Sequence, residues 1–339
     1  MIDILNYMRP FLKVKALHAA FETGLIKALD GGSVPRAALH ARLGLTPRGA
    51  ELLLRSLAAF GVVRRSGASV ACGAAFQKDM RENAALVEEL TGYMNVAYAD
   101  LQGFTRLLRT GRPAGGIEKF FEYIGRGGSS ARISRHLAAC TRNSARVICA
   151  KYDFSRHSYI LDAGGNDGEF MAAVCGFFPE VKCGVFDLPG PCATGRRRHA
   201  ALVAGRRLEF FPGSFLRGSF PKKADLIVFK SVLNDWPDKE AALFMAKAYA
   251  ALPPGGKLLL IERFDRGARR SPDDCLFDLA FMQLIVPGQD FRTLPQYRRL
   301  LGGAGFSGIK VVGRYPPGFC IIECSKKPPR PGKSRAGRV

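Results

Sequence analysis

The sequence has few acidic residues, no C-x-x-C cysteine pair and no long apolar run. Its 339 residues include 29 Asp and Glu against 51 Lys and Arg, which gives a formal net charge of +22. Such an excess suggests an anionic partner (nucleic acid, an acidic substrate or a membrane surface) but does not define a fold. No segment has the apolar length of a transmembrane helix, and Asp3 stands where a signal peptide carries bases. We therefore expect a soluble, cytoplasmic protein with no membrane partner.

The nine cysteines are scattered along the chain, and no two of them form a C-x-x-C pair. Zinc sites need closely spaced ligands, and a disulfide framework favours an even number of cysteines. We expect buried, reduced thiols and no metal site.

Residues 1–100 carry mostly helical patterns. One apolar pattern runs from Phe11 to Leu29, and a short capped helix is expected over Ser33–His40. Thr46 is the expected N-cap of a further helix, with Pro47 at its first position. A hairpin is expected over residues 61–70. Short helices followed by a hairpin are the outline of a winged helix.

A winged helix with excess arginine can bind DNA, or it can serve as a dimerisation module. The basic residues of this region are spread out rather than clustered, and the second helix is short. We favour dimerisation and do not expect a nucleic-acid partner.

Residues 101–152 form a helical linker that is expected to contribute to a substrate pocket. Residues 153–325 alternate apolar strands with helical stretches, as an open α/β sheet requires. The last two expected strands form a hairpin that adds an antiparallel strand, and the basic tail 326–339 is expected to be disordered. The expected strands are Tyr159–Ala163, Val181–Phe186, Leu208–Phe211, Ala224–Phe229, Lys257–Glu262, Ile309–Val312 and Phe319–Cys324.

A glycine-rich turn follows the first of these strands. Asp162 lies at the end of the strand, and Gly164, Asn166 and Gly168 lie in the turn before the next helix. Glycine allows a ligand to approach the backbone closely, and a helix N-terminus attracts anions. Asn166 replaces the middle glycine of the dinucleotide-binding pattern, and asparagine tolerates the left-handed conformation.

Asp187 lies at the end of the next expected strand, one βα unit after the turn. A carboxylate in this place can accept hydrogen bonds from both hydroxyls of a ribose. The turn and the acid together predict a nucleoside-containing cofactor.

The turn resembles the first motif of class I S-adenosylmethionine (SAM) dependent methyltransferases. The order of segments resembles one family of them, the small-molecule O-methyltransferases of caffeic acid, hydroxyindole and bacterial secondary-metabolite type. The resemblance covers nearly the whole chain before the tail. Besides the turn, its most specific segments are Phe186–Pro189, Lys230–Asp238, Leu252–Glu262 and Arg292–Thr293.

This resemblance implies a Rossmann-like, seven-stranded SAM-methyltransferase domain preceded by a mostly α-helical winged-helix dimerisation domain. It implies SAM as cofactor, a small-molecule acceptor and a homodimer. It places an acceptor pocket around Met282, within residues 277–287, and Phe291. The implied cofactor residues are Asp162, Gly164, Gly165, Gly168, Asp187, Leu188, Ser214, Phe215, Lys230 and Trp236, and the implied catalytic positions are Asn234, Asp235 and Glu262.

Three positions depart from the family pattern. Asn234 stands where the family has its histidine base, and an amide cannot remove a proton. Phe291 replaces an acid just before Arg292–Thr293, whereas the other acid, Glu262, is retained. Ser214 replaces an aspartate near the adenine and can still offer a hydrogen bond.

Three explanations of the missing base are open at this point. An acidic or well-aligned acceptor hydroxyl needs no dedicated base. A thioether acceptor has no proton to lose, which makes S-methylation of a methylthio acid or a methionine-like substrate an alternative. Another residue, such as His136 before the cofactor strand, can act as the base. His157 and His199 are expected to be packing or surface residues.

The function expected from the sequence is SAM-dependent methylation of a small metabolite, with oxygen as the first-choice acceptor. An alternative of another class is a SAM-sensing DNA-binding regulator or a non-catalytic relative. Methyl turnover without DNA affinity separates the enzyme from the regulator.

Overall fold

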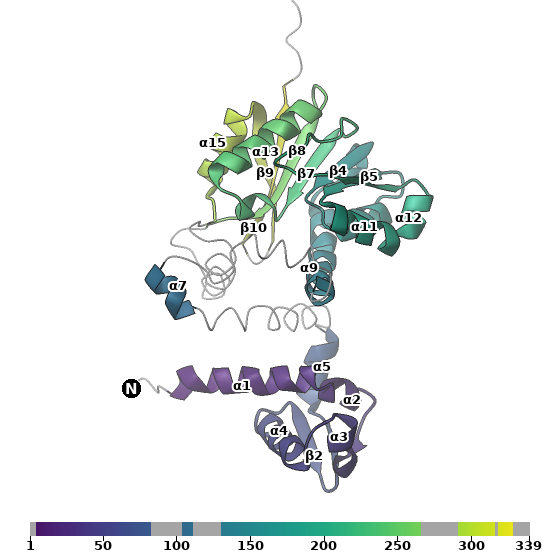
Figure 1. Cartoon of the computed structure of the whole chain (residues 1–339), viewed down its shortest axis with the longest axis vertical. Coiled ribbons are helices and arrows are strands. Elements are labelled where there is room, and N and C mark those ends of the chain that lie inside the picture. The colour runs from purple at the N-terminus through teal and green to yellow at the C-terminus, as the bar shows by residue number, and fades with distance from the viewer. Residues whose placement is uncertain (1–4, 83–103, 111–129, 266–290, 316–317, 328–339) are drawn as a thin grey trace, which may run out of the picture. The chain divides into compact units, whose positions relative to one another are not determined.

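The computed structural model describes residues 5–82, 104–110, 130–265, 291–315 and 318–327. The chain divides into two compact units, Met1–Val96 and Ala97–Val339, which are described one at a time (Figure 1).

Unit 1 is helical with a small three-stranded sheet in the order β1-β3-β2. The helical pattern expected from Phe11 to Leu29 is broken, because Gly24 adopts a φ of 76° and separates two helices. The expected cap at Ser33 is also wrong, since a short strand follows it and Pro35 occupies the N-cap position. The elements are α1 (Leu5–Glu22), α2 (Leu25–Leu29), β1 (Val34–Pro35), α3 (Arg36–Arg42), α4 (Pro47–Ala59), β2 (Val63–Ser66), β3 (Ser69–Cys72) and α5 (Ala74–Glu82).

Two local predictions in this unit are confirmed. The Thr46 side chain accepts a hydrogen bond from the Gly49 amide at 3.0 Å and caps α4, with Pro47 at its first position. Strands β2 and β3 pair antiparallel around Gly67, which adopts a φ of 54°. Leu29, Leu54, Leu57 and Val70 are among the buried side chains that hold the helices on this sheet.

Unit 2 contains a seven-stranded sheet with helices on both faces. Its strands are β4 (Tyr159–Ala163), β5 (Lys182–Asp187), β6 (Leu208–Pro212), β7 (Leu226–Lys230), β8 (Lys257–Arg263), β9 (Phe306–Tyr315) and β10 (Phe319–Lys326). Its helices are α7 (Phe104–Thr110), α9 (Ser130–Lys151), η1 (Phe154–Arg156), α10 (Glu169–Phe177), α11 (Pro189–Arg198), α12 (Ala200–Ala204), η2 (Leu233–Asp235), α13 (Asp238–Ala251) and α15 (Leu294–Gly303).

The strand order is β6-β5-β4-β7-β8-β10-β9. Strands β6, β5, β4, β7 and β8 pair parallel, whereas β10 lies antiparallel between β8 and β9. The expected strands and the C-terminal hairpin are therefore confirmed, with shifts of a few residues at strand ends. β9 is the largest such difference, because ladder bonds to β10 extend it on both sides of the expected Ile309–Val312.

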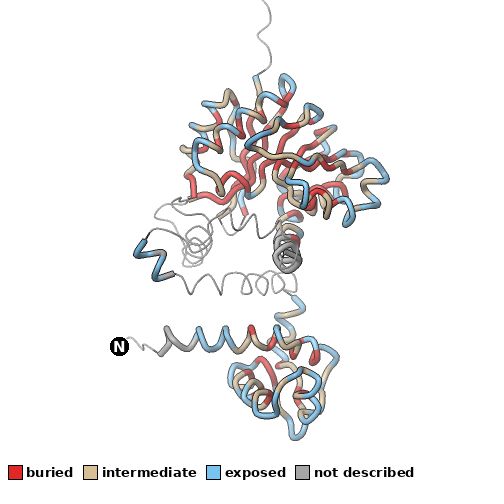
Figure 2. Tube along the Cα trace, in the orientation of Figure 1, coloured by how far each residue is buried: buried red, intermediate tan, exposed pale blue. Residues whose placement is uncertain are grey.

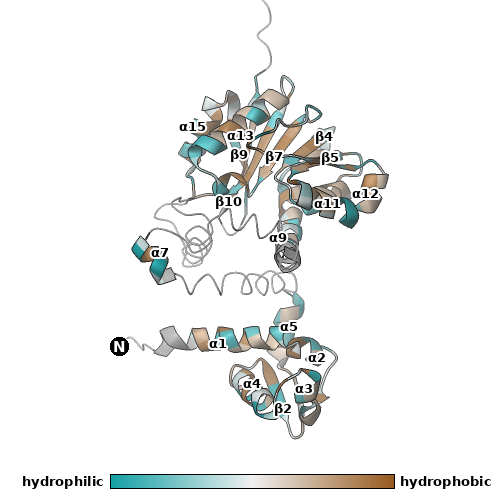
Figure 3. Cartoon of the chain, viewed as in Figure 1, coloured by the Kyte–Doolittle hydropathy of each residue, from teal (hydrophilic) through white to brown (hydrophobic). Residues whose placement is uncertain are grey.

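Two apolar layers cover the sheet. One face packs against α13 and α15 through residues such as Phe244 and Leu301. The other face packs against α9, α10 and α11 through residues such as Ile148 and Met171. Burial is concentrated along the central strands (Figure 2), which are also the hydrophobic part of the unit (Figure 3). This packing fixes the carboxyl ends of β4, β5 and β7 at one edge of the sheet, where ligands of open α/β folds bind.

Among the described helices, none has both the length and the apolar character needed to cross a bilayer. The described cysteines include several that are buried, as expected for reduced thiols: Cys175, Cys183, Cys192, Cys320 and Cys324.

Candidate active site

The turn between β4 and α10 has the conformation that its sequence predicts. Gly164, Asn166 and Gly168 adopt φ values of 83°, 52° and 81°, all in the left-handed region. A Cβ atom at Gly164 would lie 2.6 Å from Cγ2 of Val232, so no side chain fits there. Glycine is therefore required both for the backbone conformation and for the close approach of the neighbouring loop.

Asp187 lies at the end of β5, as expected, and its carboxylate holds the turn. Its Oδ2 atom accepts a hydrogen bond from the Asn166 amide at 2.8 Å, and its Oδ1 atom accepts one from the Leu188 amide at 2.6 Å. Burial raises the pKa of Asp187, whereas the two amides lower it. A carboxylate has about four lone-pair sites, so acceptor capacity remains for a ligand hydroxyl.

A second carboxyl group lies beneath the turn. Asp162 is buried, and its Oδ1 atom has no hydrogen-bond partner among the described residues. Burial and the nearby Asp187 raise the pKa of Asp162, and the charge of Lys230 opposes this shift. A Cβ at Gly165 would lie 2.6 Å from the Asp162 carboxyl, so this glycine is also required by space. Lys230 itself ends β7, with its Nζ atom 5.8 Å from the centroid of the Phe170 ring.

The aromatic side chain of Phe215 lies next to the turn. Its ring stacks on Phe186 with a centroid distance of 5.8 Å, and its Cζ atom would lie 3.2 Å from a Cβ at Gly164. Ser214, which precedes it, accepts a hydrogen bond from the Leu216 amide at 3.3 Å through its Oγ atom. The structure thus brings Phe215 and the turn together, as the cofactor assignment requires.

Leu188 and Trp236 lie on two different loops at this edge. Leu188 is exposed and precedes α11. The Trp236 ring meets Phe244 edge to face at a centroid distance of 5.2 Å. Both residues belong to the segments that follow β5 and β7, the strands on either side of β4.

The loop after β7 is held by two buried side chains, Glu262 and Arg292. Glu262 accepts hydrogen bonds through Oε1 from the Val232 amide at 2.9 Å and the Leu233 amide at 2.8 Å. Arg292 donates to the Leu233 carbonyl at 2.7 Å and the Trp236 carbonyl at 2.5 Å. These bonds fix both ends of the short helix η2, which carries Asn234 and Asp235.

Asn234 uses both of its polar atoms to bind the fold. Its Oδ1 atom accepts a hydrogen bond from the Tyr297 hydroxyl at 2.8 Å, and its Nδ2 atom donates to the Arg263 carbonyl at 3.0 Å. The Asn234 and Tyr297 side chains are both buried. The residue therefore links η2 to α15 and to the end of β8.

Two carboxyl groups lie near Asn234, of which Glu262 is buried and Asp235 is half-buried. Burial raises the pKa of Glu262 to about 7, against the opposing effect of its two amide donors. Its Oε2 atom has no hydrogen-bond partner among the described residues. Burial and the negative charge of Glu262 also raise the pKa of Asp235 well above its ordinary value. Both carboxyl groups therefore ionise less readily than a carboxyl group in water does.

Phe291 packs against Arg263, the residue whose carbonyl accepts the hydrogen bond from Asn234. The guanidinium carbon of Arg263 lies 5.2 Å from the centroid of the Phe291 ring, and both side chains are buried. The position at which the family has an acid thus contributes an aromatic ring next to a cation.

Two expected site residues lack a described side chain. His136 falls within α9, but its side chain is outside the described residues. Met282 and the rest of residues 277–287 are outside them altogether. His157 is a packing residue as expected, buried 3.0 Å from the Tyr152 hydroxyl, and His199 lies 3.7 Å from Glu169.

The sequence carries no local signal for the hydrogen-bonding roles of Tyr297 and Arg263, and Arg292 stands out only as part of a motif. The only sequence signal for a structural role of Arg292 is its position next to Thr293, which caps α15. Among the described residues, no group of His, Cys, Asp or Glu side chains could hold a metal ion.

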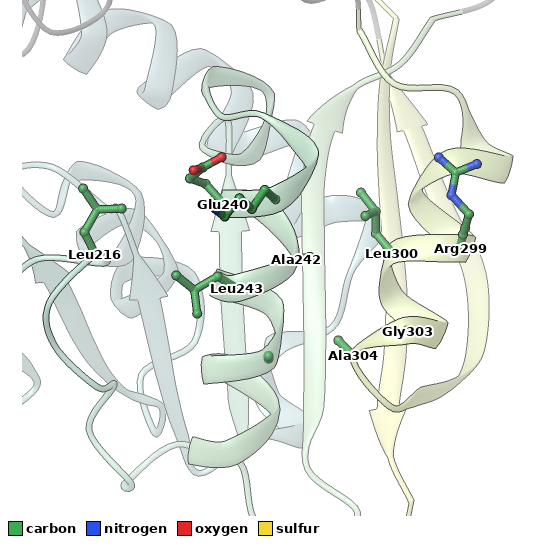
Figure 4. Close-up of a pocket in the computed structure, with 10 residues that line it drawn as sticks. Leu216, Glu240, Ala242, Leu243, Arg299, Leu300, Gly303 and Ala304 are labelled. Carbon is green, nitrogen blue, oxygen red and sulfur yellow. The ribbon is translucent and has the colours of Figure 1, made fainter.

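An apolar groove lies on the outer face of unit 2, between α13 and α15 (Figure 4). Its volume is about 740 Å³. Neither the glycine-rich turn nor Asn234 contributes to it, so it is separate from the site at the strand ends. Its lining residues are Leu216, Lys239, Glu240, Ala242, Leu243, Ala246, Arg299, Leu300, Gly303 and Ala304.

The family model of the O-methyltransferase domain matches residues 98–307. Demethylspheroidene O-methyltransferase of Rhodobacter capsulatus is 30% identical over 88% of this chain and 75% of its own. O-demethylpuromycin-O-methyltransferase of Streptomyces alboniger is 31% identical over 87% of this chain and 81% of its own. Acetylserotonin O-methyltransferase of Bos taurus is 28% identical over 90% of this chain and 92% of its own.

Solved structures agree in fold. The human N-acetylserotonin methyltransferase in complex with SAM superimposes with a TM-score of 0.81 at 24% identity, over 96% of this chain and 97% of that chain. The mitomycin 7-O-methyltransferase gives a TM-score of 0.82 at 24% identity, over 95% of this chain and 96% of that chain. These likenesses show the α/β fold of SAM-dependent methyltransferases.

Proposed function

The chain belongs to the O-methyltransferase family and is a SAM-dependent methyltransferase of small molecules, and we propose that it methylates a hydroxyl oxygen without a general base on the protein. One observation carries this proposal. Asn234 stands at the family's histidine position, and both of its polar side-chain atoms bind the fold. The relatives are named as O-methyltransferases, and they lend no support to the thioether and DNA-binding alternatives.

The residues at the strand ends fit the cofactor. Gly164 lets the Val232 and Phe215 side chains pack directly on the turn, and the Asp187 carboxylate has acceptor capacity for ribose hydroxyls. In the proposed assignment, the turn holds the methionine part of SAM, Asp187 holds the ribose, and Leu188, Ser214, Phe215 and Trp236 surround the adenine. Bound SAM supplies a methyl group made electrophilic by its sulfonium sulfur.

The protein's contribution to methyl transfer is then alignment and exclusion of water. Holding two reactants in a near-attack geometry lowers a barrier by about 7–11 kcal/mol. A general base accelerates a reaction about 10²–10⁴-fold, which corresponds to about 3–5 kcal/mol and is the smaller effect. Glu262 serves as a clamp, because Oε1 binds the Val232 and Leu233 amides and the side chain is fully buried. The acceptor hydroxyl therefore loses its proton to solvent before it is aligned with the methyl group, and the resulting oxyanion attacks.

Label transfer tests this function. The purified chain would be incubated with methyl-labelled SAM and a panel of phenols, hydroxy acids and carboxylates, with thioethers as a parallel panel. We expect the label on oxygen. Label on sulfur, or none on any small molecule, would refute the proposal.

We also propose that residues 1–100, the winged-helix-like part, form a homodimer interface and that residues 101–152 contribute to the acceptor pocket. Phe11, Leu12 and Leu52 support the first point, since their side chains are exposed by 60%, 65% and 66%. A second copy of the chain would cover such a surface. Light scattering on Leu12→Glu should report a monomer, whereas Leu243→Glu, a matched change in unit 2, should leave a dimer.

A further inference from the structure

Helix α11 packs directly on the glycine-rich turn. A Cβ at Gly195 would lie 2.6 Å from the Asp167 carbonyl oxygen and 2.4 Å from the Phe210 ring, so the helix and the turn are in backbone contact. Helix α11 starts immediately after Leu188, next to the Asp187 carboxylate. The unit formed by β5 and α11 thus contacts the turn through both Asp187 and Gly195.

An ion pair joins the two elements at this contact. The Arg198 guanidinium, at the end of α11, binds Oδ2 of Asp167, which lies between Asn166 and Gly168. The Asp167 side chain is only 5% exposed. Burial raises the pKa of Asp167, and the charge of Arg198 opposes the shift. A buried carboxylate requires such a partner, because an unpaired buried charge is strongly unfavourable.

A second set of charges surrounds the pair. Glu169, the first residue of α10, lies 3.1 Å from the Arg142 guanidinium and 3.9 Å from Arg198. His199 lies 3.7 Å from the same carboxylate. Helices α9, α10 and α11 therefore meet around the C-terminal half of the turn.

This arrangement differs from a simple solvated basic face, which is the ordinary interpretation of the run Gly195–His199. Besides Arg198, Arg196 also contacts the fold, donating to the Phe210 carbonyl at 2.7 Å. All three arginines are exposed residues, but the Arg198 side chain, 32% exposed, reaches inward to the buried carboxylate.

We propose that Arg198 is a positioning residue for the cofactor, acting through Asp167. The turn holds three residues at positive φ, and Asn166 adopts this conformation less readily than the two glycines do. Two contacts oppose its relaxation: Asp187 binds the Asn166 amide, and Arg198 binds the Asp167 side chain. Without Arg198, the buried Asp167 carboxylate moves outward or takes up a proton, and cofactor binding must then restore the turn.

The proposal rests on the proposed cofactor site, so the test measures SAM binding and turnover separately. Arg198→Met removes the charge and keeps most of the length, Arg198→Lys keeps the charge, and Arg197→Met is the matched control. We expect Arg198→Met to raise the Kd for SAM about tenfold, with kcat at saturating SAM and the acceptor KM unchanged. Arg198→Lys should recover part of this loss, and Arg197→Met should bind as the parent does.

Combining Arg198→Met with Asp167→Asn checks that the effect passes through Asp167. The double variant has no unpaired buried charge, so it should bind SAM better than Arg198→Met alone. A lowered Tm with an unchanged Kd for SAM would show that Arg198 only stabilises the fold, and would overturn this inference alone. A parent chain that does not bind SAM would overturn both the inference and the proposed function.

Discussion

The Tyr297 hydroxyl donates a hydrogen bond of 2.8 Å to Oδ1 of Asn234. The amide nitrogen of Asn234 is also occupied, by the Arg263 carbonyl at 3.0 Å. An amide has no proton affinity useful near neutral pH, and these two bonds direct it toward the fold. The residue at the position of the family's base has become a link between three elements.

Replacing Asn234 by Ala should therefore affect stability more than chemistry. We expect a kcat loss below about 100-fold, the lower end of what a general base is worth. Leaving the buried Tyr297 hydroxyl without its acceptor should cost about 1–3 kcal/mol of unfolding free energy. Tyr297→Phe is the matched control, because it breaks the same bond from the other side. A loss of about 10⁴-fold in Asn234→Ala, with Tyr297→Phe near the parent, would mean that Asn234 acts directly.

Gly164→Ala should abolish tight SAM binding. The new Cβ would lie 2.6 Å from Val232 Cγ2, in a residue with a φ of 83°. Gly255→Ala is the matched control, since Gly255 has a φ of 78° and no atom within 4 Å of an added Cβ. Both variants should lose about 1–2 kcal/mol of stability from the left-handed backbone. In calorimetric titration only Gly164→Ala should lose SAM affinity. An equal loss of SAM affinity in Gly255→Ala would contradict a specific role of Gly164 in cofactor binding.

Asp187→Ala should weaken SAM binding at least about tenfold, or about 1.4 kcal/mol. The matched control is Asp225→Ala. Asp225 holds two backbone amides at the opposite end of β4, Ser158 at 2.8 Å and Tyr159 at 3.3 Å. This control should lower Tm and leave SAM affinity unchanged. Unchanged affinity in Asp187→Ala would remove the ribose assignment.

Glu262→Gln should change how stability depends on pH. Burial raises the pKa of Glu262 from 4.5 to about 7, so its folded form prefers the proton. The stability that this group contributes is complete below about pH 4.5 and is lost as pH rises to about 7. Glutamine does not ionise, so the unfolding free energy of Glu262→Gln relative to the parent should increase across this interval and then level off. Urea unfolding at several pH values measures it, and a difference independent of pH would contradict the burial argument.

The β-sheet and the glycine-rich turn could be predicted because their signals are local. Continuous apolar runs mark buried strands, and the spacing of Gly164, Asn166, Gly168 and Asp187 places a turn and an acid one βα unit apart. Gly24 was missed as a helix break because helical apolar spacing continues on both sides of it.

The contacts that define the candidate site could not be predicted in this way. Asn234 and Tyr297 are 63 positions apart, and Asp167 and Arg198 are 31 apart. Such pairs depend on how α15 and α11 pack against the sheet, which hydrophobic periodicity does not specify. An arginine run is also most often a solvated surface, so its sequence carries no sign of the inward contact.

The most direct test of the central claim is the pH dependence of kcat/KM for methyl transfer to two hydroxyl acceptors whose own pKa values differ by about two. Without a base on the protein, each profile should rise with pH to an inflection that follows the acceptor's pKa. An inflection near pH 7 that is the same for both acceptors and disappears in Glu262→Gln would contradict the account, because it would identify Glu262 as the base.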